Sequence, residues 1–169
     1  TAGCKGLIKP LLFISARRYM ILNINAKYFG TISYTDRDPI HVINGLFGFE
    51  SYTDYLPIPF TEYDDSVISL QSLDDESLSF ILLNPFGIFP DYTPTISSED
   101  LKELGAESEA DISYYVTSVI LGSVPESTVD LKAPLAVNGF TRMAKQIILD
   151  NPDYTFRHTL SSLANKGES

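Results

Sequence analysis

The sequence predicts an all-β fold, an antiparallel barrel-like sheet with one or two short helices. Short segments of apolar or alternating residues recur along the chain, and few stretches have a helical period. Turn-forming Gly, Pro, Asn and Asp residues separate these segments. The ten Tyr and ten Phe, with no Trp, suit a pleated sheet, on which aromatic side chains pack well. About eight to ten short strands joined by regular turns are therefore expected to form the barrel.

The clearest element is a hairpin in the first half of the chain. Residues 66–71 alternate apolar and polar side chains and residues 78–83 are almost wholly apolar, so both segments are expected to be strands facing one core. The connector, 72–77, carries three acids that cannot be buried without partners, which predicts a solvated loop. Pro85 lacks an N–H and disfavours a helical Asn84, so it is expected to end the second strand, with an aromatic loop after it.

Further strands are expected before this hairpin. Residues 21–24 and 31–34 read as a meander that opens the sheet. The dipeptide Asn44-Gly45 predicts a tight turn, because both of its residues tolerate positive φ. Residues 52–63 contain two prolines, which cannot donate to a ladder, and are expected to be an edge strand or a covering loop.

Beyond the hairpin, residues 97–105 carry the clearest helix signal, with a Ser cap, early acids and a final Gly. The Tyr-, Val- and Ile-rich segment 112–121 is expected to be a long central strand. The Asn138-Gly139 dipeptide between 135–137 and 140–149 predicts another tight hairpin turn.

Charge is distributed unevenly along the chain. The whole sequence has 12 basic and 22 acidic residues, a formal net charge of −10. Residues 1–19 hold four of the basic residues, have no acid and do not start with Met, so we expect a non-native or disordered extension ahead of Met20. Residues 20–158 form the predicted β-barrel domain, and the Ser-rich residues 159–169 are expected to be a flexible tail.

Composition also argues against several classes of function. An acidic body repels phosphate backbones, so we expect no direct nucleic-acid binding and favour a basic protein partner instead. Cys4 is the single cysteine, which fits a reducing cytoplasm and rules out an intrachain disulfide or a thiolate zinc site. The apolar runs are shorter than the roughly 18–20 residues of a membrane span, and no membrane association is expected.

Enzymatic motifs find little support. The sequence has no nucleophile elbow, phosphate-cradling loop or metalloprotease helix motif. His41 and His158 lie far apart in sequence, and neither sits in a ligand-like cluster. The acidic runs 64–65 and 74–76 lack the alternating acids and central Gly of a calcium loop. We therefore expect no enzyme, no metal site and no cofactor.

Six segments, taken in order between Met20 and His158, resemble the FliW family of bacterial flagellar assembly factors. The matching segments are 25–30 (NAKYFG), 44–50 (NGLFGFE), 70–75 (LQSLDD), 84–92 (NPFGIFPDY), 131–138 (LKAPLAVN) and 145–150 (KQIILD). One departure is Phe47, which stands where the family usually has Pro.

The resemblance implies a non-enzymatic partner switch in the cytoplasm. Proteins of this kind bind flagellin and also bind CsrA, a small basic RNA-binding translational regulator. When flagellin is secreted, the freed factor sequesters CsrA, so that CsrA no longer represses flagellin mRNA. The same two partners are expected here, and an acidic, aromatic-bearing β-domain is compatible with them.

Three short segments are the predicted partner-binding surface. They are the Gly48 turn, the acidic hairpin tip and the aromatic loop after Pro85, in which aromatic side chains would supply binding energy and acids would raise the association rate. The residues are Phe47, Phe49, Glu50, Asp74, Asp75, Glu76, Phe86, Phe89, Asp91 and Tyr92. An equally weighted interpretation is that Phe86 and Phe89 plug the end of the barrel.

Two other classes of function stay open. A small-ligand binder or enzyme would hold a pocket at the barrel mouth, lined by Tyr114, Tyr115 and His158. A purely structural subunit would present a large, constitutive apolar interface.

Overall fold

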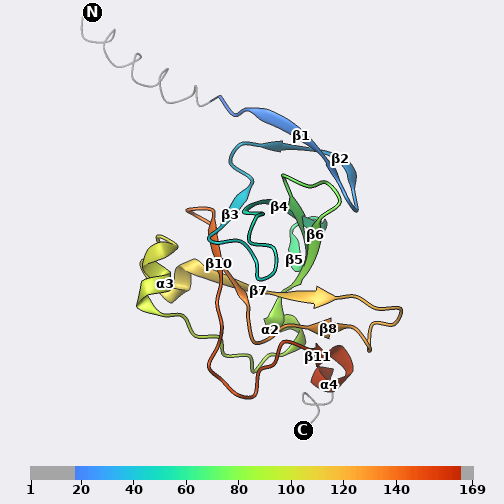
Figure 1. Ribbon diagram of the computed structural model, residues 1–169, viewed down its shortest axis with the longest axis vertical. Coiled ribbons are helices and arrows are strands. Elements are labelled where there is room, and N and C mark those ends of the chain that lie inside the picture. Colours follow the sequence, from blue (N-terminus) through green and yellow to red (C-terminus); the bar gives the residue numbers. More distant parts are fainter. Residues whose placement is uncertain (1–17, 165–169) are drawn as a thin grey trace, which may run out of the picture.

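The computed structural model describes residues 18–164, and these form a strand-rich body with three short α-helices (Figure 1). The predicted N-terminal extension lies outside the described residues except for its last two, and so do residues 165–169 of the predicted tail. Within the described part of the chain, no helix is long and apolar enough to cross a membrane.

Seven strands close into a barrel, which confirms the predicted fold class. The ring runs β3-β4-β5-β6-β7-β9-β10, and the β10–β3 pairing closes it. All of its pairings are antiparallel except this last one, which is parallel, with Met143 opposite His41. The strands are β3 (Ile40–Val42), β4 (Asp54–Thr61), β5 (Asp64–Ser72), β6 (Ser79–Leu83), β7 (Ile112–Val119), β9 (Leu135–Asn138) and β10 (Met143–Gln146).

The predicted opening meander is a separate hairpin of β1 (Ile21–Ala26) and β2 (Gly30–Thr35). It lies at the far end of the body from helix α4 (Figure 1). Apolar residues of the hairpin pack against Leu56 and Ile58 of β4. The Lys27 backbone N–H also donates to Gln71 Oε1 at 2.8 Å, which ties the hairpin to the buried part of β5.

Short elements cover one outer side of the barrel. They are α2 (Pro85–Ile88), α3 (Ser98–Glu103), the 3₁₀ turn η1 (Glu109–Asp111), β8 (Thr128–Val129), β11 (His158–Thr159) and α4 (Leu160–Ala164). Helix α3 begins after Ser97, whose side chain caps the Asp100 N–H, and Gly105 follows with φ of +65°, as predicted. In the described part of the predicted tail, Thr159 ends β11 and residues 160–164 form α4, in which Leu163 is only 3% exposed.

Apart from the cluster under the β1–β2 hairpin, the alternation of side chains divides the core into an inner and an outer cluster. All seven barrel strands contribute to the inner cluster, which includes Tyr55, Leu70, Leu82 and Leu135. The outer cluster lies between the barrel and the covering elements. Successive residues of a strand point to opposite faces, so Tyr114 joins the outer cluster while Tyr115 packs against the inner one.

The two Asn-Gly dipeptides behave differently. Asn44 and Gly45 have φ of +62° and +69°, as the predicted tight turn requires. At Asn138-Gly139 the predicted hairpin forms, because β9 and β10 pair antiparallel, but its turn is longer than a tight Asn-Gly turn. Residues 139–142 all separate β9 from β10, and the left-handed residue is Arg142, with φ of +60°. The cause is the buried Asn138 side chain, which accepts the Phe140 N–H at 3.0 Å and donates to the Leu104 carbonyl at 2.9 Å.

The barrel has a closed end and an open end. At the closed end, the turn after β3 places Leu46 in the inner cluster, where it is 2% exposed. At the open end, β3 pairs with β4 only at Ile40–Tyr55 and His41–Asp54. Among the described strands, the rest of β4 therefore has no hydrogen-bonded strand on that side. Its two prolines, 57 and 59, fall in this free stretch, which agrees with the predicted edge strand.

Candidate functional site

The Gly48 turn presents two phenylalanines at the closed end of the barrel. Phe47 is 49% exposed and Phe49 is 39% exposed, although the alternation of the segment predicts one exposed ring. The turn is fixed by hydrogen bonds: the Phe47 N–H donates to Gln146 Oε1 at 2.9 Å, and the Gly48 N–H donates to the Glu50 carboxylate at 2.9 Å. This last bond holds the pKa of the exposed Glu50 carboxyl below its usual value.

The acidic hairpin tip lies next to this turn. The ring of Phe49 meets the ring of Phe80 edge-on at 4.9 Å, and Phe80 follows the tip on β6. Asp74 is close enough to Tyr55 to add to the raised pKa of that buried phenol, about 12, of which burial is the main cause. The structure therefore brings together two of the three predicted segments.

Hydrogen bonds hold the tip in one shape. The buried Gln71 amide donates to the carbonyls of Glu76 and Leu78, both at 3.1 Å. The Asp75 carboxylate accepts from the Ser77 hydroxyl at 2.6 Å, and this bond lowers the pKa of the Asp75 carboxyl. Asp74 and Glu76 stay exposed to solvent, as a charged loop requires.

The aromatic loop after Pro85 lies at the other end of β6, away from the tip. It begins with helix α2, where a loop was expected, because the Asn84 side chain caps the Phe86 N–H and Pro85 occupies the first turn. Phe86 is 44% exposed and Asp91 is exposed, whereas Phe89 is half-buried, with its ring 6.4 Å from that of Tyr154.

Tyr92 is a core residue, and its prediction as a surface contact is wrong. Its side chain is 3% exposed, its ring lies 4.9 Å from that of Tyr154, and its hydroxyl donates to the Leu131 carbonyl at 2.8 Å. Of the predicted aromatic loop, Phe86 and Asp91 therefore remain as the freely exposed candidates.

An exposed apolar segment after β7 escaped the sequence prediction. Val119, Ile120, Leu121 and Val124 are between 50% and 67% exposed. The strand was expected over 112–121 but ends at Val119, so Ile120 and Leu121 lie beyond the hydrogen-bonded ladder. Val124 also lines a groove of about 680 Å³ with Ile88 of α2 and Leu160 of α4. The sequence signal for this exposed segment is the apolar run 119–121, which continues up to Gly122 without a polar residue.

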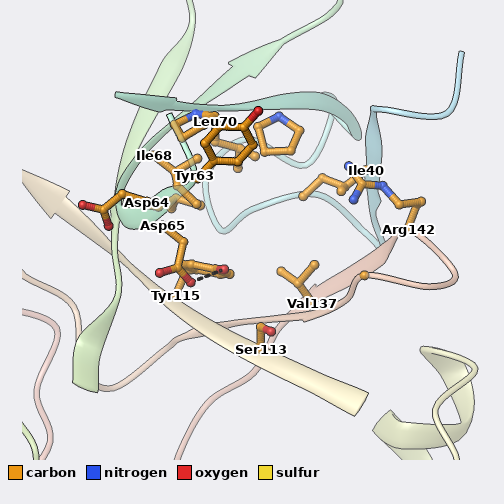
Figure 2. Close-up of a pocket in the computed structure, with 14 residues that line it drawn as sticks. Ile40, Tyr63, Asp64, Asp65, Ile68, Leu70, Ser113, Tyr115, Val137 and Arg142 are labelled. Carbon is orange, nitrogen blue, oxygen red and sulfur yellow. Dashed lines mark hydrogen bonds between the residues drawn. The ribbon is translucent and has the colours of Figure 1, made fainter. Parts of the chain in front are cut away.

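The open end of the barrel holds a hollow of about 460 Å³ (Figure 2). Ile40, Ile68, Leu70, Leu82 and Val137 line it with apolar side chains. Polar groups stand around it: Figure 2 shows Asp65 beside the Tyr115 hydroxyl on one side and Arg142 on the other. The Tyr115 hydroxyl donates to the Asp65 carboxylate at 3.0 Å.

The predicted pocket of Tyr114, Tyr115 and His158 does not form. Tyr115 lines the hollow, Tyr114 faces the outer cluster, and His158 lines a separate pocket beside Tyr154. The His158 Nε2 atom accepts the Thr155 N–H at 2.8 Å, so this nitrogen already has a partner. Within residues 18–164, no group of three or more His, Cys, Asp or Glu residues is placed to hold a metal ion.

Together, these features define a small β-barrel protein that presents exposed aromatic rings beside carboxylates at its closed end and an apolar hollow at its open end. The profile of the family described as FliW protein matches residues 23–160, so the chain belongs to the FliW family.

Individual relatives agree with this assignment. The chain is 34% identical over 146 residues to the flagellar assembly factor FliW of Shouchella clausii, which covers 86% of this chain and 99% of the relative. It is 35% identical over 136 residues to that of Clostridium botulinum, covering 80% and 95%. A crystal structure of the flagellar assembly factor FliW superposes with a TM-score of 0.76 at 29% identity, covering 82% of this chain and 96% of the other.

Proposed function

We propose that this protein is a non-enzymatic flagellar assembly factor that acts in the cytoplasm by binding two proteins in turn. One partner is flagellin and the other is the basic translational regulator CsrA. While flagellin is abundant it occupies the factor. When flagellin is secreted, the freed factor sequesters CsrA and relieves repression of flagellin mRNA.

Membership of the FliW family is the observation that carries this proposal. The curated relatives named above are flagellar assembly factors, and the chain spans 99% and 95% of their lengths. A shared function therefore concerns the whole of this domain and not a fragment of it.

The chemistry of the closed end supports a protein partner. Phe47 and Phe49 are exposed in the Gly48 turn beside Glu50, and the ring of Phe49 contacts Phe80, which follows the acidic tip on β6, so apolar contact area and negative charge occur near one another. Aromatic side chains are enriched where protein interfaces gain most of their affinity, and charges near them speed the encounter with an oppositely charged partner. Residues 20–169 carry 8 basic and 22 acidic residues, which favours a basic partner such as CsrA.

A double substitution at the closed end tests the proposal. Phe47→Ala with Phe49→Ala is compared with Phe156→Ala, a matched removal of a 55% exposed ring elsewhere. Calorimetric titration with purified CsrA and with purified flagellin should give tight binding by the wild type and the control, and a loss of roughly 30-fold or more toward at least one partner in the double variant. Failure of the wild type to bind either protein would overturn the proposed function. Binding by the double variant equal to wild type for both partners would show that these rings are not the contact surface.

A further inference from the structure

The hollow at the open end exists because one wall of the barrel is short. Strand β3 is three residues long, so beyond Tyr55 the edge of β4 that faces it has no partner among the described strands and the inner cluster is not covered there. The bottom of the hollow is apolar: Ile68, Leu70 and Leu82 line it and are at most 8% exposed. Its volume of about 460 Å³ falls within the roughly 300–1,000 Å³ of sites that bury a ligand.

One side of the opening carries a fixed negative charge. The Asp65 carboxylate accepts from the Tyr115 hydroxyl at 3.0 Å and from the Asn84 amide at 3.3 Å. A carboxylate offers about four acceptor positions, so Asp65 keeps room for a further donor. Asp64 stands next to it, with its carboxylate held by the Ser66 hydroxyl at 2.6 Å, and adds a second negative charge to this side.

The opposite side is occupied by Arg142. Its guanidinium donates to the carbonyls of Asp38 and Pro39, which bridges the start of β10 to the turn before β3. These two hydrogen bonds use some of the five N–H donors of the guanidinium, and they give Arg142 a structural role in addition to its charge. Asp65 is therefore the group at the opening best placed to attract a cation.

The side chain of Tyr63 lines the opening and is almost fully exposed. Tyr63 is 97% exposed and has φ of +62°, a conformation that is costly for a residue with a side chain. Phe140, next to Gly139 in the lining, is 96% exposed. Fully exposed rings at a mouth supply contact area to a bound partner at little entropic cost.

The backbone at the opening is unsuited to strand addition. The unpaired edge of β4 carries prolines at positions 57 and 59, which have no N–H to offer an incoming strand. A polypeptide bound here would therefore be held by its side chains and not by a new ladder.

We propose that the open end of the barrel binds an extended segment of a protein partner, which inserts an aliphatic side chain into the hollow and places an adjacent Lys or Arg at Asp65. This inference rests on the proposed function in that the segment belongs to a captured protein. It names a second contact surface at the opposite end of the barrel from Phe47 and Phe49. The apolar bottom selects the aliphatic residue, and the carboxylates select the cation beside it.

Capped tetrapeptides test the hollow without either full partner. The probes are Gly-Leu-Lys-Gly, Gly-Leu-Gln-Gly and Gly-Leu-Glu-Gly, titrated up to 10 mM, a range chosen to detect millimolar affinity. The readout is the methyl spectrum of the full chain. The Lys peptide should give saturable shifts of the Ile68, Leu82 and Val137 methyl signals, with at least about 5-fold weaker binding of the Glu peptide.

Two matched glycine variants locate the site. Gly139 lines the hollow, and a Cβ added at either Gly139 or Gly122 meets nothing within 4 Å, so both positions accept a larger residue. Gly139→Trp should abolish the shifts, whereas Gly122→Trp should leave them unchanged. Asp65→Asn should bring the affinity for the Lys peptide down to that for the Gln peptide.

No saturable shift at these methyls, equal binding of the Lys and Glu peptides, or shifts that persist in Gly139→Trp would each overturn the inference. The result is separable from the proposed function. If the wild-type protein binds CsrA and flagellin but no peptide, the hollow proposal alone fails. If it binds the Lys peptide but neither protein, the proposed function alone fails.

Discussion

The Tyr115 hydroxyl donates to the Asp65 carboxylate at 3.0 Å, which joins β7 to β5 across the end of β6. The bond sits at the open end of the barrel, where the wall is least complete. Burial, followed by the bond to Asp65, raises the pKa of Tyr115 to about 12.

The raised pKa of Tyr115 predicts how stability depends on alkaline pH. Below the unfolded value of about 10 the phenol is protonated in both states. Between about 10 and 12 the unfolded chain releases a proton that the folded protein retains, so the free energy of unfolding should fall through this window. Tyr115→Phe should make the fall shallower in urea titrations between pH 9 and 12, without abolishing it, because Tyr55 has a similarly raised pKa. An identical pH slope in the variant would contradict the assignment.

Substitution should cost more stability at Tyr92 than at Phe86. Tyr92→Phe removes the donor to the Leu131 carbonyl and leaves that buried group unpaired, so we expect a loss of about 1–3 kcal/mol in the free energy of unfolding. Phe86→Ala truncates a ring that is 44% exposed and should cost less than about 1.5 kcal/mol. Chemical denaturation measures both, and a larger loss at Phe86 than at Tyr92 would reverse the assignment of core and surface.

Gly45 and Gly48 form a matched pair in the turn at the closed end. Both have positive φ, but an added Cβ at Gly45 would lie 2.7 Å from the Glu50 Cα atom, whereas at Gly48 it would meet nothing within 4 Å. Gly48→Ala should therefore cost only the backbone strain of roughly 1–2 kcal/mol. Gly45→Ala should cost about 1–3 kcal/mol more because the backbone must move. Equal melting temperatures of the two variants would show that the backbone at Gly45 moves to accept a Cβ at no extra cost, which would contradict the prediction.

Lys145 ties helix α3 to β10. Its Nζ atom lies 2.6 Å from Asp100 Oδ1 and 2.8 Å from Glu103 Oε2, and the bond to Lys145 is the main cause of the lowered pKa of Asp100. A lowered carboxyl pKa stabilises the fold above the unfolded value of about 4, and this contribution disappears as the pH falls through the folded pKa. Lys145→Met should reduce stability by about 1–2 kcal/mol at neutral pH and flatten the acid limb of the stability curve.

Lys102→Met is the control for this prediction, since Lys102 lies on helix α3, which Lys145 contacts, and is exposed. It should leave both the neutral-pH stability and the acid limb close to wild type. Equal effects of the two substitutions in thermal scans from pH 2 to 7 would argue against a specific Lys145 contact.

The sequence predicts best where local chemistry decides the structure. The Asn44-Gly45 turn, the Ser97 cap and the acidic tip all depend on residues within a few positions of one another, and the structure has all three. The closed barrel also follows from the many short strands and turns.

Tertiary contacts decide the parts that sequence reasoning missed. The turn at Asn138 is set by a bond to Leu104, 34 residues away, which no local rule contains. Tyr92 is buried because Leu131 and Tyr154 lie over it, although the aromatic loop looks exposed in sequence. The open-end hollow depends on where β3 stops pairing with β4, and strand ends are poorly marked in sequence.

The central claim is that this acidic barrel captures both CsrA and flagellin, and a titration at two salt concentrations tests it most directly. Wild type and an Asp74→Asn, Glu76→Gln variant are titrated with each purified partner at about 50 mM and about 300 mM salt, spanning a strong change in screening. Tight wild-type binding to both partners is predicted, with the CsrA complex weaker at the higher salt and less salt-dependent in the variant. Wild-type binding to neither partner would contradict the claim.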